Sequence, residues 1–304
     1  MEKLNGLIAA GFTPFKGGKI NTEVIPTYAK YLVRSGVSGV FVNGTTGESL
    51  SLTVEERLLL AEAWTRSAPK ELKVIIHVGH NSLPACEKMA AHAQEKGAWA
   101  VSAMAPTFFK PDLNGLVSYI AQVAVAAPDL PFYYYHMPSM TGASFLMTDF
   151  LKQADGLIPN LAGIKYTWED LMDYSLTADY AGGKYDVVFG RDEILLCGLA
   201  LGAKAAIGST YNFAAPLYNA VRAAVAEKDF EKANELQLVS MKLIAACRAA
   251  TPCDLSGIKA LTGWRAGVDL GPLRAPISAI EADAARKLFE TAEKIGGAYL
   301  SVKS

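Results

Sequence analysis

The sequence predicts an α/β fold, a (β/α)8 TIM barrel followed by a C-terminal helical extension. Eight short apolar runs occur in order along the 304 residues, and helical patterns fill the gaps between them. Most of the runs are nearly continuous rather than alternating, as is typical of parallel strands that are covered on both faces. Eight strands that are each followed by a helix predict a closed barrel.

The apolar runs define the predicted strands, which span residues 7–15, 39–47, 73–79, 99–106, 130–138, 161–167, 186–193 and 205–210. The structural alternative is an open, doubly wound sheet, which usually carries a Gly-x-Gly-x-x-Gly motif after its first strand. Here the first run ends in Thr13-Pro14-Phe15 without such a motif. The sequence therefore favours the barrel.

The helical segments carry start and stop signals. After the first run, Ile25, Tyr28 and Leu32 keep helical spacing, and Gly36 can end that helix. Three later helices are predicted to begin at capping signals, namely Thr53 with Glu56, Ser82 ahead of Pro84, and Thr167 with Asp170. From about residue 212 the pattern is helical only. We therefore expect the barrel over residues 1–229 and a helical extension over residues 230–304, packed on the barrel.

Composition excludes several classes of partner. Apolar residues make up 51% of the chain, charged residues 19%, and the formal net charge is −1. Such a surface does not attract nucleic acid or an anionic membrane. Residues 4–12 lack a cleavage-site pattern and are interpreted as a strand rather than a signal peptide. No apolar segment reaches the roughly 20 residues that a membrane span needs. Four scattered cysteines without a Cys-x-x-Cys pair indicate free thiols. We expect a cytoplasmic protein.

The chemistry is expected at the C-terminal ends of the strands, where barrel enzymes place their active sites. Lys165 lies in an apolar run, and the period-2 alternation puts it on one face with Gly163 and Thr167. Small and polar neighbours indicate the face that lines the barrel mouth, where a desolvated amine can act as a nucleophile. The alternative is a lysine that reaches water or pairs with a carboxylate.

Two other strand ends offer polar groups. Tyr135 lies near the end of the fifth run, where a phenol can relay protons, although a packed aromatic residue is the alternative. Thr45 and Thr46 lie between Gly44 and Gly47 at the end of the second run, where N–H groups and hydroxyls can hold a carboxylate. A plain turn is the alternative. No metal site is expected, because His77 and His80 have no His-Glu-x-x-His motif or acidic cluster beside them. We also see no phosphate-binding loop.

Together these stretches resemble the N-acetylneuraminate lyase and dihydrodipicolinate synthase superfamily over nearly the whole chain. The motifs that carry the resemblance are Gly44-Thr45-Thr46-Gly47-Glu48, then Tyr135 followed by Met137-Pro138, then Gly163-Ile164-Lys165. Residues 41–48, 132–136 and 208–212 look like the animal-type lyase branch. Two departures from the synthases agree with this branch. Met140 stands where the synthases carry an arginine, and Thr107-Phe108-Phe109 replaces the stretch whose tyrosine they lend to a neighbouring subunit.

The resemblance implies a Schiff-base lyase that cleaves N-acetylneuraminate, a sialic acid, to N-acetylmannosamine and pyruvate, with no cofactor. It implies that Lys165 carries the covalent intermediate, that Tyr135 moves the proton, and that Thr45 and Thr46 hold the pyruvyl carboxylate. The residues that it implies for the sugar tail are Thr167, Gly190, Asp192, Glu193 and Ser209. It also implies a homotetramer. The alternatives are a related lyase for another 2-keto-3-deoxy sugar acid and a non-catalytic protein that binds pyruvate or a sugar acid.

Overall fold

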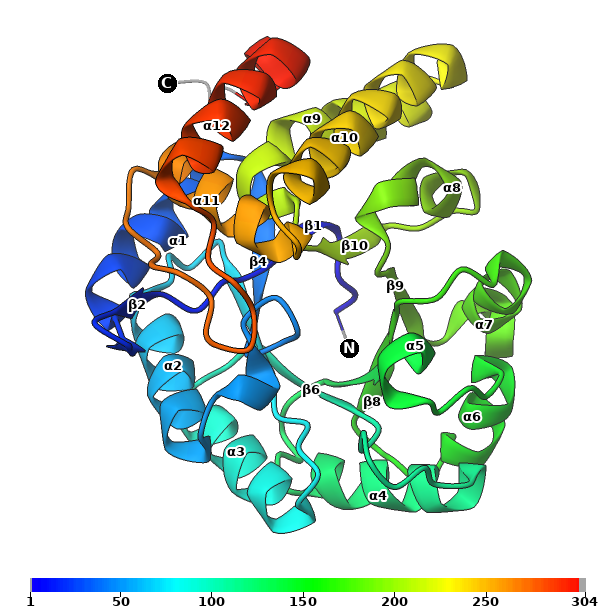
Figure 1. Cartoon of the computed structure of the whole chain (residues 1–304). Helices are drawn as coiled ribbons and strands as arrows, with labels where there is room; N and C mark the ends of the chain where they lie inside the picture. The colour runs from blue at the N-terminus through cyan, green and yellow to red at the C-terminus, as the bar shows by residue number, and fades with distance from the viewer. Residues whose placement is uncertain (1, 301–304) are drawn as a thin grey trace.

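A computed structural model of the chain describes residues 2–300. Within that range eight parallel strands close into a barrel with the helices outside it (Figure 1), so the predicted (β/α)8 barrel is confirmed. Because β1 pairs with both β4 and β10, the ring has no free edge. In order around the barrel the strands are β1 (Gly6–Ala10), β10 (Ala205–Gly208), β9 (Asp186–Phe189), β8 (Leu161–Tyr166), β7 (Phe132–His136), β6 (Ala100–Met104), β5 (Lys73–His77) and β4 (Val37–Val42).

Most strands are shorter than the apolar runs that predict them. The first run continues to Phe15, whereas β1 ends at Ala10, and the second continues to Gly47, whereas β4 ends at Val42. The residues that follow these two strands, such as Phe12, Thr13 and Asn43, are themselves buried. Burial therefore continues from each strand into the loop behind it. A small hairpin, β2 (Phe15–Lys16) with β3 (Lys19–Ile20), follows β1.

The outer helices are α1 (Ile25–Arg34), α2 (Val54–Ser67), α3 (Leu83–Glu95), α4 (Leu113–Val125), α5 (Pro138–Thr141), α6 (Met147–Ala154), α7 (Leu171–Gly183), α8 (Leu195–Ala200) and α9 (Tyr211–Ala226). The predicted capping box of Thr53 and Glu56 begins α2. Ser82 precedes α3, but its side chain makes no capping hydrogen bond. The prediction that Thr167 opens a helix was wrong. Asp170 caps α7 by accepting from the Asp173 amide, while Thr167 is buried at the end of β8.

Two apolar cores result from the alternation along the strands. One fills the barrel and includes Phe41, Tyr133 and Tyr135. The other lies between the barrel and its helices and includes Ile164 and Tyr166. Ile164 and Tyr166 alternate with Lys165 along β8 and therefore lie on its other face, so Lys165 points into the barrel, as the sequence predicts.

Three further helices and a short 3-10 turn follow α9. They are α10 (Phe230–Ala250), α11 (Asp254–Ala266), α12 (Ala282–Gly296) and η4 (Gly297–Leu300), and Figure 1 shows the three helices gathered at one side of the barrel beside α9 and α1. The expected boundary between residues 229 and 230 falls where α10 begins, with Asp229 as its N-cap. In the part of the chain that the structure describes, no helix has the length and hydrophobicity needed to span a membrane.

Candidate active site

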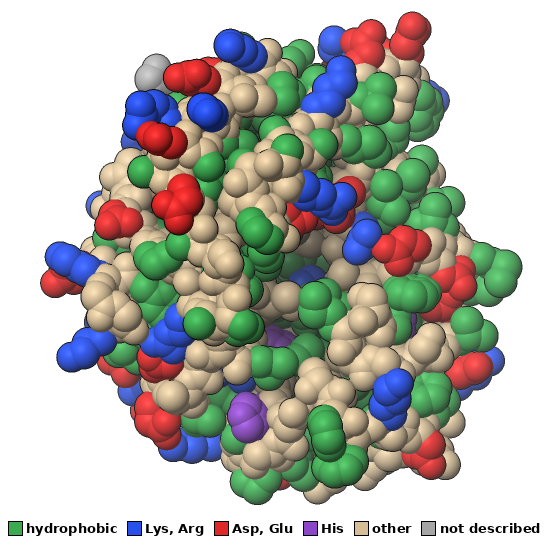
Figure 2. Space-filling view, in the orientation of Figure 1, with side chains coloured by type: hydrophobic (Ala, Val, Ile, Leu, Met, Phe, Trp, Pro, Cys, Tyr) green, Lys and Arg blue, Asp and Glu red, His purple; other side chains and the backbone are tan. Residues whose placement is uncertain are grey.

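A cavity of about 210 Å³ lies at the carboxyl ends of the strands. Figure 2 shows this face of the molecule hollowed near its centre, with side chains of both charges at the rim. All the site residues predicted from the sequence line this one cavity, although they come from five different strand ends. They are Thr45, Thr46, Tyr135, Lys165, Thr167, Gly190, Asp192, Glu193 and Ser209.

Lys165 occupies the centre of this arrangement. It is opposite Tyr135 in the β7–β8 register and only 5% exposed. Its Nζ lies 3.6 Å from the ring centroid of Tyr135 and 4.3 Å from that of Phe41. The amine is thus largely removed from water and held between aromatic rings, with one side open to the cavity. A buried amine beside an open pocket is suited to attack a bound carbonyl.

Tyr135 connects the lysine to the turn after β4. The Tyr135 hydroxyl lies 3.3 Å from the Thr45 hydroxyl, and either oxygen can donate. The His77 ring packs edge-on against Tyr135, with 5.6 Å between centroids. Burial holds the pKa of His77 well below its ordinary value, and the charges of Arg57 and Lys165 lower it further. His77 is therefore uncharged near neutral pH, and Tyr135 beside the amine is the candidate proton-transfer group.

The turn after β4 is tightly built. The Glu48 amide donates to the Thr45 carbonyl at 3.0 Å, and the Thr13 hydroxyl donates to the Gly47 carbonyl at 2.7 Å. A Cβ on Gly47 would lie 3.0 Å from the Gly11 carbonyl oxygen, so only glycine fits without a shift. Thr45 and Thr46 consequently present their hydroxyls from a fixed backbone. Hydroxyls and amides of a rigid turn are suited to hold a carboxylate.

The opposite side of the cavity carries hydroxyl and carboxyl side chains. The Thr167 hydroxyl is buried and has no hydrogen-bond partner among residues 2–300, which leaves it available to a ligand. Gly190 is needed beside it, because a Cβ there would lie 2.1 Å from Thr167 Oγ1. Asp192 is partly engaged already, since its Oδ2 accepts from the Thr210 amide at 2.8 Å and the Thr210 hydroxyl at 2.6 Å. Only its second oxygen is left for a ligand.

Glu193 is held less tightly than Asp192. Its carboxylate oxygens lie 3.7 Å from Arg191 Nε and 3.9 Å from Arg248 Nη2, beyond hydrogen-bonding distance. Burial, together with the negative charge of Asp192, raises the pKa of Glu193 to about 7. This carboxyl can therefore change its protonation state near neutral pH while it faces the cavity.

Sequence reasoning missed the contribution of the C-terminal helices. The side chains that it did not assign to the cavity include Ile244 of α10 and Asp254, Leu255 and Ile258 of α11. No local signal marks these residues, since Ile244, Leu255 and Ile258 are ordinary apolar positions of helices. Met140, whose side chain is uncharged, also lines the cavity and is exposed.

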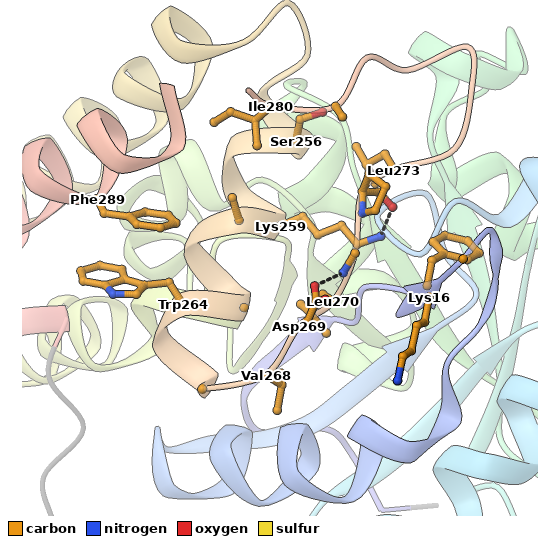
Figure 3. Close-up of a pocket in the computed structure, with 18 residues that line it drawn as sticks. Lys16, Ser256, Lys259, Trp264, Val268, Asp269, Leu270, Leu273, Ile280 and Phe289 are labelled. Atoms are coloured by element: carbon orange, nitrogen blue, oxygen red, sulfur yellow. Dashed lines mark hydrogen bonds between the residues drawn. The ribbon is translucent and has the colours of Figure 1, made fainter. Parts of the chain in front are cut away.

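A larger cavity of about 680 Å³ lies behind α11, but Lys165 and Tyr135 are absent from its lining (Figure 3). Within residues 2–300, no group of three or more His, Cys, Asp or Glu side chains is placed to hold a metal ion. The smaller cavity is therefore the candidate site, because the convergent polar groups and the buried lysine are there.

Comparison with known proteins agrees with this geometry. Residues 3–295 match the model of the dihydrodipicolinate synthetase family. The chain belongs to this family. Within it, the chain is 41% identical to N-acetylneuraminate lyase of Xenopus tropicalis over 287 residues, which cover 93% of each protein.

Solved structures of family members superpose closely on the chain. The N-acetylneuraminate lyase (sialic acid aldolase) of Aliivibrio salmonicida has a TM-score of 0.94 and 37% identity, with 99% of each chain covered. A catalytic lysine mutant of the Ruminococcus gnavus sialic acid aldolase has a TM-score of 0.90 and 28% identity, with 96% of this chain and 95% of that chain covered.

Proposed function

We propose that this protein is a lyase that cleaves N-acetylneuraminate to N-acetylmannosamine and pyruvate through a Schiff base on Lys165. The observation that carries the proposal is the buried Lys165 amine, 3.6 Å from the Tyr135 ring and open to a polar cavity. The identity of 41% to the Xenopus tropicalis lyase supports the choice of substrate. The structure of the Ruminococcus gnavus aldolase with its catalytic lysine mutated supports a lysine as the group that reacts.

The reaction begins at the ketone of the open-chain sialic acid. The Lys165 amine adds to this carbon and water leaves, which gives a protonated imine. Tyr135 relays the proton of the C4 hydroxyl, with the substrate carboxylate as acceptor. The electrons of the C3–C4 bond then flow into the imine, so an enamine of pyruvate and the aldehyde of N-acetylmannosamine form. Protonation of the enamine at C3 and hydrolysis release pyruvate and restore the amine.

The two halves of the substrate fit the two sides of the cavity. Thr45 and Thr46 hold the carboxylate of the pyruvyl half. The sugar tail carries several hydroxyls and needs both donors and acceptors. The free Thr167 hydroxyl supplies a donor, and the Glu193 carboxyl supplies an acceptor. Ser209, Gly190 and the second oxygen of Asp192 complete this side.

The test is release of pyruvate from N-acetylneuraminate, followed by trapping of the intermediate. Incubation with pyruvate and borohydride should inactivate the enzyme and leave one adduct at Lys165, with none at Lys184 or Lys204. Lys165→Ala should lose both labelling and turnover. Lys165→Arg should fail too, because a guanidinium stays protonated.

Each contrary result identifies a different error. Trapping without cleavage of N-acetylneuraminate, but with cleavage of another 2-keto-3-deoxy sugar acid, would overturn the substrate. Binding of pyruvate without any adduct would indicate a non-catalytic protein. An adduct on another lysine would refute the role of Lys165.

We propose further that the protein works as a homotetramer in the cytoplasm. Phe108 and Phe109 support the assembly, since they are 78% and 82% exposed and lie where the related synthases contact a neighbouring subunit. The four cysteines, all free, suit a reducing compartment. Light scattering of the purified protein should give four times the mass of one chain, and a monomer would refute the assembly.

A further inference from the structure

A buried ion pair joins the C-terminal extension to the turn that carries Thr45 and Thr46. Lys259 Nζ lies 3.2 Å from Glu48 Oε1, and the two side chains are only 2% and 1% exposed. The partners are 211 positions apart in the sequence. Figure 3 shows Lys259 reaching away from its helix toward the segment that carries Leu273. Its Nζ also donates to the Pro272 carbonyl at 2.9 Å.

The extension holds both oxygens of the Glu48 carboxylate. While Lys259 binds Oε1, the backbone amide of Arg274 donates to Oε2 at 2.7 Å. Glu48 itself has a left-handed backbone, with φ of 62°, which is uncommon for a residue with a side chain. Its amide is bonded to the Thr45 carbonyl. The position of the Glu48 side chain is thereby linked through one short turn to the hydroxyl that faces the substrate.

Folding stability does not explain this pair. Burial lowers the pKa of Lys259 to about 8 even though the charge of Glu48 opposes the shift. Burial thus weakens proton binding relative to the unfolded chain, although the ammonium still predominates at neutral pH, and keeping this charge buried costs folding free energy. Buried ion pairs are commonly no more stabilising than well-packed apolar groups of similar size. A pair that stabilises the fold little but fixes the direction of two side chains is suited to holding the neighbouring turn in position.

Helix α11 connects the Lys259–Glu48 pair to the wall of the active-site cavity. Leu255 and Ile258 line the active-site cavity, whereas Ser256 and Lys259 line the larger cavity behind the helix. The same helix therefore forms part of the wall of the substrate cavity and fixes the carboxylate-binding turn. A shift of α11 would move both at once.

We infer that Lys259 and Glu48 are positioning residues, which together hold Thr45 and Thr46 in the arrangement that captures the carboxylate of the 2-oxo acid. This inference rests on the proposed function, since it assumes that pyruvate binds at this turn. It assigns to the extension a specific role in binding one half of the substrate. The other half, which lies toward Thr167 and Glu193, should be unaffected by the pair.

The test compares Glu48→Gln, Lys259→Met and the double variant. In each we would measure the pyruvate concentration that gives half-maximal borohydride trapping, the KM for N-acetylmannosamine in the condensation direction, and kcat. The matched control is Arg265→Met with Glu293→Gln, which removes an ion pair of 2.8 Å between α11 and α12. Thermal unfolding of every variant accompanies the kinetics.

We expect the half-saturating pyruvate concentration to rise about tenfold or more in Glu48→Gln and in the double variant, with the KM for N-acetylmannosamine and kcat within about threefold of the original. The control should change none of these. Lys259→Met alone leaves a buried carboxylate without its cation and can fail to fold, so the double variant decides. Unchanged pyruvate trapping in a folded double variant would overturn the inference. So would a double variant that does not fold, because the pair would then serve stability.

The trapping assay separates this inference from the proposed function, because it contains no sugar. If the original protein traps pyruvate but does not cleave N-acetylneuraminate, the choice of substrate fails while the positioning role is still decided by the variants. If the original protein traps no pyruvate, both fail together.

Discussion

Removal of the Tyr135 hydroxyl should lower the turnover but leave the thermal stability nearly unchanged. In Tyr135→Phe the ring stays against Lys165, and only the hydroxyl 3.3 Å from Thr45 is lost. A hydrogen bond this long contributes little to folding, so we expect a nearly unchanged Tm. Turnover of N-acetylneuraminate should fall about 10²–10⁴-fold, as is usual when a proton-transfer group is removed. That loss corresponds to about 2.7–5.5 kcal/mol of transition-state stabilisation.

Tyr133 is the matched control, because it lies two positions earlier on the same face of β7 and is also buried. Its hydroxyl donates to Asp186 at 3.0 Å, well below the cavity. Tyr133→Phe removes a hydrogen bond to a carboxyl group, worth about 1.5–3 kcal/mol if that group is ionised. The Tm should therefore fall by roughly 3–12 °C, while kcat stays within about threefold.

The assay is pyruvate release at saturating N-acetylneuraminate, with thermal unfolding followed on the same preparations. The role of the Tyr135 hydroxyl in proton transfer would be refuted if Tyr135→Phe kept more than a tenth of the turnover. It would also be refuted if Tyr133→Phe lost turnover to the same extent, since the phenol at the mouth would then have no special role.

Three other predictions concern binding. Glu193 ionises as the pH rises through about 7, and an ionised carboxylate accepts stronger hydrogen bonds from a polyol. The KM for N-acetylneuraminate should therefore fall as the pH rises through this range in the original protein and should not change with pH in Glu193→Gln. If the pH dependence of KM persisted in the variant, another group would be responsible for it. Gly190→Ala places a Cβ 2.1 Å from Thr167 Oγ1, so we expect about 1–3 kcal/mol of lost stability and a raised KM, and normal kinetics would contradict the close packing. Condensation of pyruvate with aspartate semialdehyde should be at least about tenfold slower than with N-acetylmannosamine, because Met140 offers no cation, and a charged hydrogen bond is worth about 1.5–3 kcal/mol; efficient condensation would place the protein among the synthases.

The sequence was enough to predict those site residues whose orientation follows from the alternation along a single strand or from their place at a strand end. Alternation along one strand was enough to turn Lys165 into the barrel, because a residue two positions away must share its face. The rule that active sites gather at the carboxyl ends of barrel strands then brought Lys165, Tyr135 and Thr45 together. These inferences needed no knowledge of how distant segments pack.

Contacts between distant segments could not be predicted in this way. Thr167 followed by Asp170 has the spacing of a capping box, yet the strand continues through Tyr166 and Asp170 alone caps the helix. The commitment of Asp192 to Thr210 depends on two loops meeting. The placement of Ile258 over the cavity depends on how the last helices fold back onto the barrel, which no periodicity records.

The distance along the chain between Glu48 and Lys259 has a consequence for biosynthesis. A ribosome adds about 5–20 residues per second, so the 211 positions between them represent roughly 10–40 s of elongation. During that interval the nascent chain contains Glu48 but not the lysine that neutralises it in the finished protein. An unpaired carboxylate is costly to bury, so we expect the turn after β4 to pack fully only after α11 has been made. A chain that ended before residue 259 would consequently contain Lys165 and Tyr135 but lack the cation that holds Glu48.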